Sequence, residues 1–435
     1  MGGSGLSIQR GSLGVLVALT ALLIALCVSI GAAPRADSAV AEDDDTRIPG
    51  HYIVVLEDST DHPGAVAQAQ TDAHGGRLGF VYRYALKGYS AELSDEAVEA
   101  LRSDPRVKSV TPDREAKPGF QSNPTGVKRV FAIANQKLAI NTKADFVVDA
   151  DIAVMDTGVE EKHPDLKVVK VIDCMSKTCS AETENVPSGS HGTHVAGIAA
   201  AIDNAEGVVG VAPGARIWSV KISTATSTSE AVLLAGVDWV TSKASEIEVA
   251  NMSIWCICSM PLLEAAIKKT VENGVVFVTI AGNKAELNAE NVSPAKNPDA
   301  ITVGSIADYD GQPNGESKTP PCSLAHYEKL VGAEEDDTWA NESSWGPVVD
   351  IVAPGICIYS SVLSKLYGFD SGTSMAAPHV AGAAAILAAQ SNPNNKADVE
   401  KIRETILEEG NKNWTAEYEG EQQPLLDVSN EAVFK

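Results

Sequence analysis

The chain has 435 residues, with 58 acidic and 34 basic side chains and a formal net charge of −24. This excess of negative charge excludes functions that depend on basic phosphate-binding patches, so we do not expect nucleic acid as a partner. The length allows one large domain together with smaller units, and a hydrophobic content of 44% is typical of a globular core.

The N-terminal segment predicts export from the cell. Arg10 precedes an apolar run over residues 13–30, which is followed by Gly-Ala-Ala. A basic start, an apolar middle and small residues at the end are typical of a secretory signal peptide, which we expect at 1–33. Because the run is about long enough to span a membrane, anchoring through residues 13–33 is the alternative. The acidic stretch 34–47 is interpreted as a spacer.

Residues 48–117 form the first predicted folded unit. The stretches HYIVVLE, RLGFVYRY, KGYSAELS and RVKSV have the composition of strands, and two helical stretches lie among them. The second helix has Ser94 at its start, where a serine side chain can cap free backbone donors. The order β-α-β-β-α-β predicts a small ferredoxin-like α+β unit. A stretch rich in Pro, Gly and polar residues then leads into residues 118–435.

Residues 118–435 alternate short apolar stretches with helical ones. Stretches such as ADIAVMD, RIWSVKI and GVVFVTIAG are almost continuously apolar, as expected of strands that are buried on both faces. The alternation predicts an α/β domain with a mostly parallel sheet flanked by helices. The pattern lapses in a polar insertion at 308–344, and a loop of this length is either functional or flexible.

Seven cysteines are present, one of them in the apolar N-terminal run. The even number that remains in an exported chain predicts disulfides, and Cys174 and Cys179 are close enough to close a local loop. We expect no bridge between Cys256 and Cys258, because residues two apart in a strand are held too far apart. The other pairings stay open. Asn-X-Ser/Thr sequons also suit an exported glycoprotein.

Three polar residues stand at the ends of predicted strands or helices. Asp156 ends an apolar stretch, His191 begins a helix of small residues, and Ser374 precedes an alanine-rich helix. In open α/β sheets, functional groups gather at the carboxyl ends of the strands. The N-terminus of a helix favours a developing negative charge, which suits a nucleophile. Taken alone each residue has a structural alternative, and Ser374 could be a plain N-cap.

The motifs DTG (156–158), HGTHVAG (191–197) and SGTSMAAPHVAG (371–382) resemble those of the subtilisin-like serine proteases, peptidase family S8, and more closely the proteinase K branch. The order Asp, His, Ser is also that of the family. Residues 48–117 resemble an I9-type inhibitory propeptide. The resemblance implies a secreted endopeptidase acting on proteins or peptides. It also implies a self-processed zymogen whose propeptide is an intramolecular inhibitor and chaperone; we expect a monomer.

Each residue then has a chemical role. Ser374 Oγ attacks the peptide carbonyl and forms an acyl-enzyme, while neutral His191 takes its proton and later gives it to the leaving amine. Asp156 holds the imidazole in the required tautomer and stabilises its charged form. The oxyanion needs hydrogen-bond donors. One is the backbone N–H of Ser374, and by resemblance the second is the Asn283 side chain.

The resemblance places substrate binding along Ser253, Ile254 and Trp255, with Gly282 beside them, where extended substrate adds to the edge of a strand. Trp255 and Cys256 replace two small residues of the family's Ser-Leu-Gly-Gly pattern. A non-catalytic binding protein with a blocked cleft is therefore one alternative. A lipase-like hydrolase is excluded, because those chains run serine, acid, histidine.

No cofactor is expected for the chemistry, but the resemblance implies a structural calcium site. Its ligands correspond to the carbonyl oxygens of Pro298 and Ala300 and to the carboxylate of Asp350. Few protein ligands completed by water suit the oxygen preference of calcium. In the alternative interpretation, Asp350 makes a hydrogen bond at the surface. His194 is interpreted as a packing residue, because HGTH lacks the glutamate of zinc-binding H-E-x-x-H.

Overall fold

The computed structural model describes residues 2, 47–84, 86–114, 121–181, 187–314, 317, 320–322, 335–415 and 422–435. Nearly all of the predicted signal peptide and spacer, and the start of the predicted linker, therefore lie outside the described residues. The chain forms two compact units, residues 1–117 and 118–435. Among the described residues, no helix is both long and apolar enough to cross a membrane.

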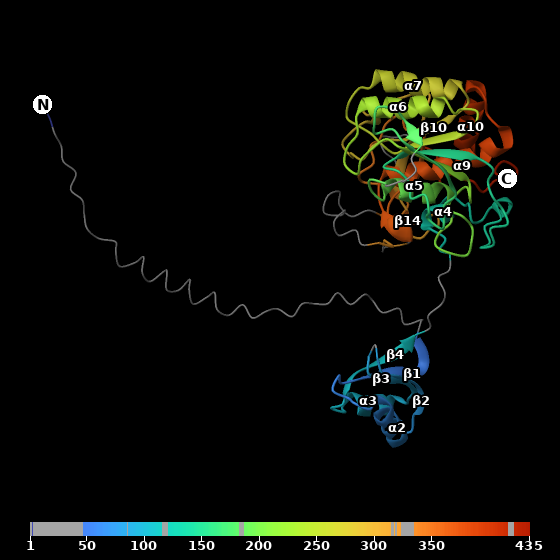
Figure 1. Ribbon diagram of the computed structural model, residues 1–435. Coiled ribbons are helices and arrows are strands. Elements are labelled where there is room, and N and C mark those ends of the chain that lie inside the picture. Colours follow the sequence, from blue (N-terminus) through green and yellow to red (C-terminus); the bar gives the residue numbers. More distant parts are fainter. Residues whose placement is uncertain are drawn as a thin grey trace. The chain divides into compact units, whose positions relative to one another are not determined.

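The first unit is a four-stranded antiparallel sheet with two helices (Figure 1). Its elements are β1 (Arg47–Leu56), α2 (Pro63–His74), β2 (Arg77–Tyr82), β3 (Gly88–Glu92), α3 (Asp95–Arg102) and β4 (Val107–Arg114). The predicted order β-α-β-β-α-β is confirmed, and the strands lie in the order β2-β3-β1-β4. Buried Val54, Tyr89 and Leu101 belong to its core. Ser94 Oγ accepts a hydrogen bond from Ala97 N and caps α3, as expected.

The second unit is built on one large sheet with the strand order β12-β11-β10-β9-β5-β8-β6-β7 and with β13 beside β11. These strands are β5 (Asp151–Asp156), β6 (Val168–Asp173), β7 (Ser180–Ala181), β8 (Arg216–Lys221), β9 (Val249–Met252), β10 (Val276–Ile280), β11 (Ile301–Ala307), β12 (Thr338–Trp339) and β13 (Ile351–Pro354). Only the two-residue strands β7 and β12 pair antiparallel within this described sheet. The predicted mostly parallel sheet is confirmed.

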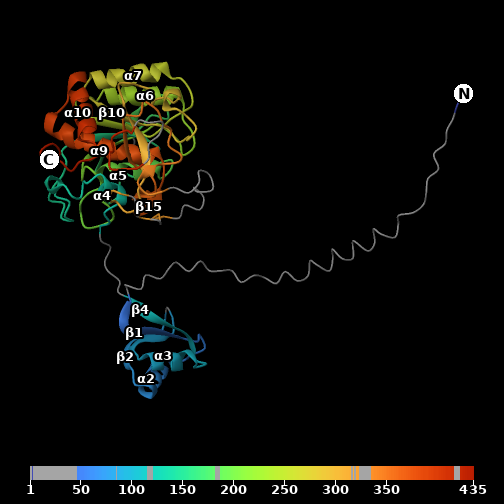
Figure 2. The ribbon, with the colours of Figure 1, turned by 180° about the vertical axis from the view of Figure 1, so that it is seen from behind.

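Helices cover both faces of this sheet. They are α4 (Thr125–Arg129), α5 (His191–Ala200), α6 (Glu230–Thr241), α7 (Pro261–Glu272), α9 (Thr373–Ser391) and α10 (Lys396–Glu409). Short 3₁₀ turns η2 (Gln136–Leu138), η3 (Ala289–Asn291) and η4 (Leu363–Lys365) and a hairpin of β14 (Ile358–Val362) and β15 (Leu366–Asp370) complete the described elements. Figures 1 and 2 show α6 and α7 on one side of the sheet and α5 and α9 on the other.

Helices α5 and α9 approach each other closely because their sequences are rich in Ala and Gly. A Cβ atom added at Gly382 of α9 would lie 3.0 Å from Ala199 O of α5 and 2.7 Å from Val211 Cβ. Only glycine fits there without movement of the neighbours. The close packing holds the first turns of the two helices, which carry His191 and Ser374, against one edge of the same sheet.

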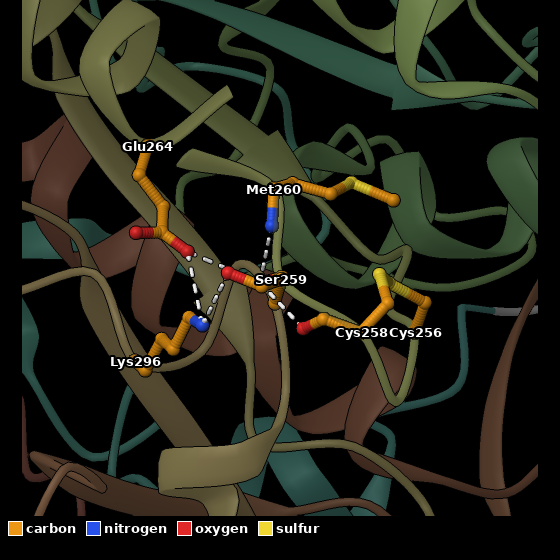
Figure 3. Close-up of a disulfide and its surroundings, with 7 residues drawn as sticks. Cys256, Cys258, Ser259, Met260, Glu264 and Lys296 are labelled. Carbon is orange, nitrogen blue, oxygen red and sulfur yellow. Dashed lines mark hydrogen bonds and ion pairs between the residues drawn. A yellow bond between two sulfur atoms is a disulfide. The ribbon is translucent and has the colours of Figure 1, made fainter. Parts of the chain in front are cut away.

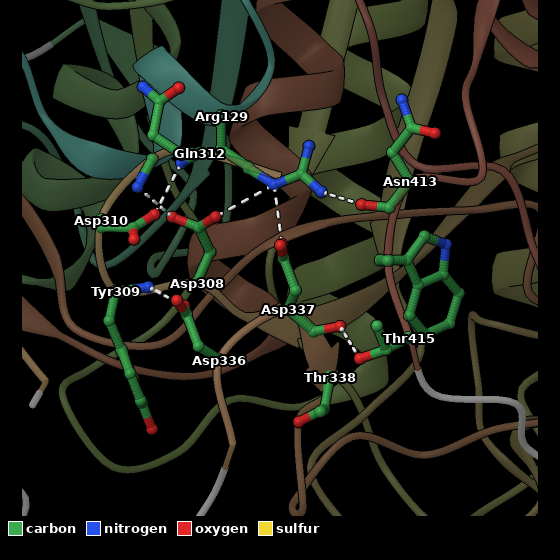
Figure 4. Close-up of polar contacts among 12 residues, drawn as sticks. Arg129, Asp308, Tyr309, Asp310, Gln312, Asp336, Asp337, Thr338, Asn413 and Thr415 are labelled. Atoms are coloured by element: carbon green, nitrogen blue, oxygen red, sulfur yellow. Dashed lines mark hydrogen bonds and ion pairs between the residues drawn. The ribbon is translucent and has the colours of Figure 1, made fainter. Parts of the chain in front are cut away.

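A buried arginine ties the described ends of the 308–344 insertion to the rest of the unit (Figure 4). Arg129 Nε lies 2.8 Å from Asp337 Oδ1 and 3.0 Å from Asp308 Oδ2, and Arg129 Nη2 donates to Asn413 O at 2.5 Å. All three charged side chains are fully buried. Burial raises the pKa of Asp308 to about 8, although the charge of Arg129 opposes this. Contacts with Arg129 therefore hold both described ends of the insertion.

The disulfides agree with one sequence prediction and correct another. Cys174 and Cys179 form the expected local bridge, and Cys322 pairs with Cys357. Cys256 and Cys258 are also bridged, so the prediction that they are not was wrong. The prediction assumed an extended strand, but the regular strand β9 ends at Met252 and the chain bends after it. The two Cα atoms come within 5.3 Å, which a disulfide spans.

Candidate active site

Asp156 and His191 form a hydrogen-bonded pair at the carboxyl end of β5. Nδ1 of His191 lies 2.9 Å from both Oδ1 and Oδ2 of Asp156, and Thr157 N donates to Oδ1 at 2.7 Å. Asp156 is only 1% exposed, whereas a third of the His191 side chain remains accessible. A buried carboxylate with these partners holds the proton on Nδ1 and leaves Nε2 of the imidazole free to accept one.

The surroundings of His191 favour its protonated form. Burial by itself lowers the pKa of His191, but the charge and hydrogen bond of Asp156 and the charge of Asp370 outweigh burial and raise it to about 9. The imidazole therefore accepts a proton readily. His194 lies in the same helix, and its Nε2 is 3.0 Å from Ile358 O and 3.1 Å from Gly368 O. It is 1% exposed, which agrees with its interpretation as a packing residue.

Ser374 is the second residue of α9, and the N-cap position is Gly372. The alternative of Ser374 as a plain N-cap is therefore wrong. Its backbone N–H lies in the first turn, where helix donors have no partner inside the helix. Gly372 has φ of 141°, a conformation that favours glycine. Among the described residues the His191 ring hydrogen-bonds to Asp156 and not to Ser374.

Asn283 follows β10 and is oriented by the residue before Ser374. Its side-chain Oδ1 accepts hydrogen bonds from Thr373 N at 2.9 Å and from Thr373 Oγ1 at 2.7 Å. These bonds engage the oxygen of the amide, so its Nδ2 atom points away from Thr373. Nδ2 lies 3.2 Å from the position that a Cβ atom added at Gly372 would take. Sequence reasoning did not identify Thr373 as this positioning residue, although it stands inside the motif that carries Ser374.

A cavity of about 480 Å³ opens beside these groups. Asp156, His191, Asn283 and Ser374 all line it, together with residues 223–230 and 253–256. The structure thus brings together the residues that sequence analysis assigned to one site. Because the cavity remains open next to Ser374, the alternative of a blocked cleft is not favoured.

The predicted substrate strand borders this cavity. Ser253, Ile254 and Trp255 line it, and Ser253 Oγ donates to Ser374 O at 3.3 Å. Gly282 lies beneath the indole of Trp255, because a Cβ there would come within 3.2 Å of Trp255 Cε3. Trp255 packs against two clusters of buried apolar side chains. Its ring therefore forms part of the wall and leaves the cavity accessible.

The Cys256–Cys258 disulfide braces the same wall, which the sequence did not reveal (Figure 3). Cys256 and Ser293 exchange two backbone hydrogen bonds, Cys256 N to Ser293 O at 3.0 Å and Ser293 N to Cys256 O at 3.1 Å. Ser293 Oγ contacts Cys258 O at 3.0 Å and Glu264 Oε1 at 3.1 Å. Cys256 and Ser293 both line the cavity, so the bridge and these bonds determine its shape.

The residues of the predicted calcium site do not fit a calcium ion in this arrangement. Arg403 of α10 donates from Nη1 to Pro298 O and from Nη2 to Asp350 Oδ1, each at 2.5 Å. The other carboxylate oxygen of Asp350 accepts from Thr302 N at 2.8 Å. The guanidinium of Arg403 therefore contacts two of the three groups expected to hold the metal, and Ala300 O is the third. A calcium ion at this place would be repelled by the positive charge of the guanidinium.

A different set of carboxylates lies close enough together to hold a cation. Oxygen atoms of Asp308, Asp310 and Asp336 are all within 4.8 Å of one another. Backbone N–H groups of Gly311, Gln312, Tyr309 and Ser317 already donate to these carboxylates. Arg129 also contacts Asp308. Such contacts keep acidic groups together without a metal, so the cluster alone does not establish calcium binding.

Comparison with known proteins indicates the same class of protein as the geometry of the site. Residues 149–423 match the subtilase family, Peptidase S8, and residues 51–118 match the peptidase inhibitor I9 family. Subtilisin E of Bacillus subtilis (strain 168) is 32% identical over 317 residues, which are 72% of this chain and 73% of that protein. M-protease of Shouchella clausii (strain KSM-K16) is 30% identical over 389 residues, 88% of this chain and 90% of that protein.

Comparison with solved structures indicates the same fold. The crystal structure of a cold adapted subtilisin-like serine proteinase matches with a TM-score of 0.54 and 28% identity, over 70% of this chain and 97% of that one. Fold and family together define a serine-type endopeptidase. The chain belongs to the subtilase family, and it carries a peptidase inhibitor I9 unit ahead of the peptidase domain.

Proposed function

We propose that this protein is a secreted endopeptidase that hydrolyses peptide bonds through Asp156, His191 and Ser374 and that matures by cutting off its own propeptide. The observation that carries this proposal is the Asp156–His191 pair, joined at 2.9 Å, on the same cavity as Ser374. A carboxylate, an imidazole and a hydroxyl at the start of a helix are the groups that nucleophilic acyl transfer needs.

The reaction begins when a peptide carbonyl lies against Ser374. Neutral His191 removes the Oγ proton through Nε2 as Oγ attacks, and Asp156 stabilises the imidazolium that forms. The imidazolium then protonates the leaving amine, which departs and leaves an acyl-enzyme. Water, activated by the same imidazole, hydrolyses the ester and regenerates Ser374. No cofactor takes part in these steps.

Two donors stabilise the oxyanion in this proposal. The backbone N–H of Ser374 lies at the positive end of α9, and Asn283 Nδ2 is the side-chain donor. The bonds from Thr373 to Asn283 Oδ1 support this role, because they fix the amide before substrate arrives. Substrate backbone pairs alongside Ser253, Ile254 and Trp255, with Gly282 leaving space beside Trp255.

The chain is proposed to be a zymogen of the I9 type. Residues 1–33 are the signal peptide, 34–47 the spacer, 48–117 the inhibitory propeptide, and 118–435 the peptidase domain with its 308–344 insertion. The propeptide acts as intramolecular inhibitor and folding chaperone until it is cut near residue 117, and the product is a secreted monomer. Membership of the proteinase K branch stays a prediction.

The first experiment compares the mass of the exported wild-type chain with that of Ser374→Ala. We expect the wild type to be trimmed near residue 118 and the Ser374→Ala chain to keep its propeptide. Ser391→Ala, a serine at the exposed end of the same helix, is the matched control and should mature like the wild type. If the wild type and Ser374→Ala are trimmed equally, another protease matures the chain and self-processing is wrong.

A further inference from the structure

The cavity beside Ser374 contains a carboxylate that the reaction does not use. Glu230 is the first residue of α6 and lines the cavity. Its Oε1 atom is shielded from solvent and accepts no hydrogen bond within the described part of the chain. A carboxylate oxygen is usually either solvated or paired, because leaving it buried without a donor costs free energy.

The charges around this cavity are unbalanced. Of the described residues that line it, Asp156 and Glu230 are the carboxylates, and none is lysine or arginine. Asp156 is already engaged by His191 and by Thr157 N. Because His191 pairs with Asp156, no lysine or arginine among the described lining residues balances Glu230. The whole chain also carries a net charge of −24, which attracts positively charged substrates over a longer range.

A glutamate in the first turn of a helix has a simple structural explanation, since the positive end of the helix stabilises a carboxylate. That explanation accounts for why Glu230 is tolerated at this position. It does not account for the shielded oxygen, because a residue that only serves the helix can turn its carboxylate into solvent.

Apolar side chains on the same cavity suit the rest of a basic side chain. Leu233, Trp255 and Met260 line it together with Glu230. The methylene stem of lysine or arginine packs well on such surfaces while its charged end reaches a carboxylate. The indole of Trp255 adds attraction for a nearby cation. In a partly dehydrated cavity each of these electrostatic contacts is stronger than in water.

We propose that Glu230 is a specificity-determining residue that selects peptides with a lysine or arginine side chain in the part of the cavity next to α6. This inference rests on the proposed function and names its substrate class. The charged end of the substrate side chain donates to Glu230 Oε1, and its stem packs on Leu233 and Trp255.

The test uses the mature enzyme and fluorogenic peptides in which each position in turn is Lys, Leu or Glu. At one position, wild type should prefer Lys over Leu by at least about tenfold in kcat/KM, mostly through KM. Glu230→Gln should bring that ratio close to one. Glu230→Lys should reverse the preference toward Glu. Glu246→Gln removes the same charge from an exposed site and should keep the wild-type ratio.

The outcomes separate the two proposals. If the wild type cleaves the peptides but Glu230→Gln keeps the full preference for Lys, or no position prefers a basic residue, this inference is overturned and the proposed function stands. If the mature wild type cleaves none of the peptides or unfolded proteins, the proposed function fails, and the inference fails with it.

Discussion

Arg403 and Asp350 form a partly buried ion pair in which Nη2 lies 2.5 Å from Oδ1, while Nη1 of the same guanidinium reaches Pro298 O. Arg403 lies in α10, 53 residues beyond Asp350, and contacts two of the groups that the sequence resemblance implies as calcium ligands. Burial raises the pKa of Asp350, and the charge of Arg403 opposes this. The guanidinium supplies the positive charge that an ion would otherwise supply.

Replacing Arg403 by methionine should destabilise the peptidase unit by about 2 kcal/mol, because Asp350 loses its ionic partner and stays buried. In Arg403→Met, millimolar calcium should recover part of the lost stability, since the freed oxygens of Asp350 and Pro298 suit that ion. Thermal unfolding with and without calcium measures both effects.

Lys401→Met is the matched control, because Lys401 is an exposed cation on the same helix. It should change the melting temperature little. This interpretation would be contradicted if calcium raised the melting temperature of the wild type but not that of Asp350→Asn. That result would restore the predicted calcium site.

Replacing Asn283 by alanine should lower kcat by about 10²- to 10³-fold with little change in KM, because the amide acts on the oxyanion and not on the ground state. Thr373→Val removes one of the two bonds that orient the amide and keeps the backbone N–H, so its loss in kcat should be smaller. Steady-state kinetics on a peptide substrate measures both. An Asn283→Ala enzyme with wild-type kcat would remove Asn283 from the mechanism.

The activity should rise with pH up to alkaline values. Asp156 and Asp370 raise the pKa of His191 to about 9 against the effect of burial, and only the neutral imidazole can accept the Ser374 proton. The profile of kcat/KM should therefore increase through about pH 9. Asp370→Asn should move the rise to lower pH, because one negative charge that stabilises the imidazolium is gone. A rise that stays in place in Asp370→Asn would exclude this charge as a cause.

Removing the Cys256–Cys258 bridge should weaken substrate binding more than chemistry. In a Cys256→Ser, Cys258→Ser double variant, KM should rise about threefold to tenfold and kcat should change less, since the bridge positions the cavity wall and not the triad. The corresponding double variant at Cys174 and Cys179 is the control, because that bridge does not line the cavity. Equal effects of both double variants would indicate a general loss of stability.

Much of the fold followed from local patterns. The continuous apolar run that ends at Asp156 predicts a strand buried on both faces, and the small residues after His191 and Ser374 predict a helix at each place. Such signals are local, because each depends on the periodicity and size of neighbouring side chains. The bridge between Cys256 and Cys258 was missed for the opposite reason, since the chain after Met252 leaves the regular strand and Cys256 pairs with Ser293, which is distant in sequence.

The sequence by itself thus determined the α/β class of the second unit and the order of elements in the first, and its motifs marked the three residues that we propose as the triad. Only the tertiary structure decided which side chains from other elements lie around the candidate site residues. Thr373 orients Asn283, Arg403 contacts Asp350, and Glu230 keeps a shielded oxygen in the cavity. Each of these relations joins or surrounds side chains from separate elements. Their meeting depends on how helices and strands pack, which neither spacing nor composition records.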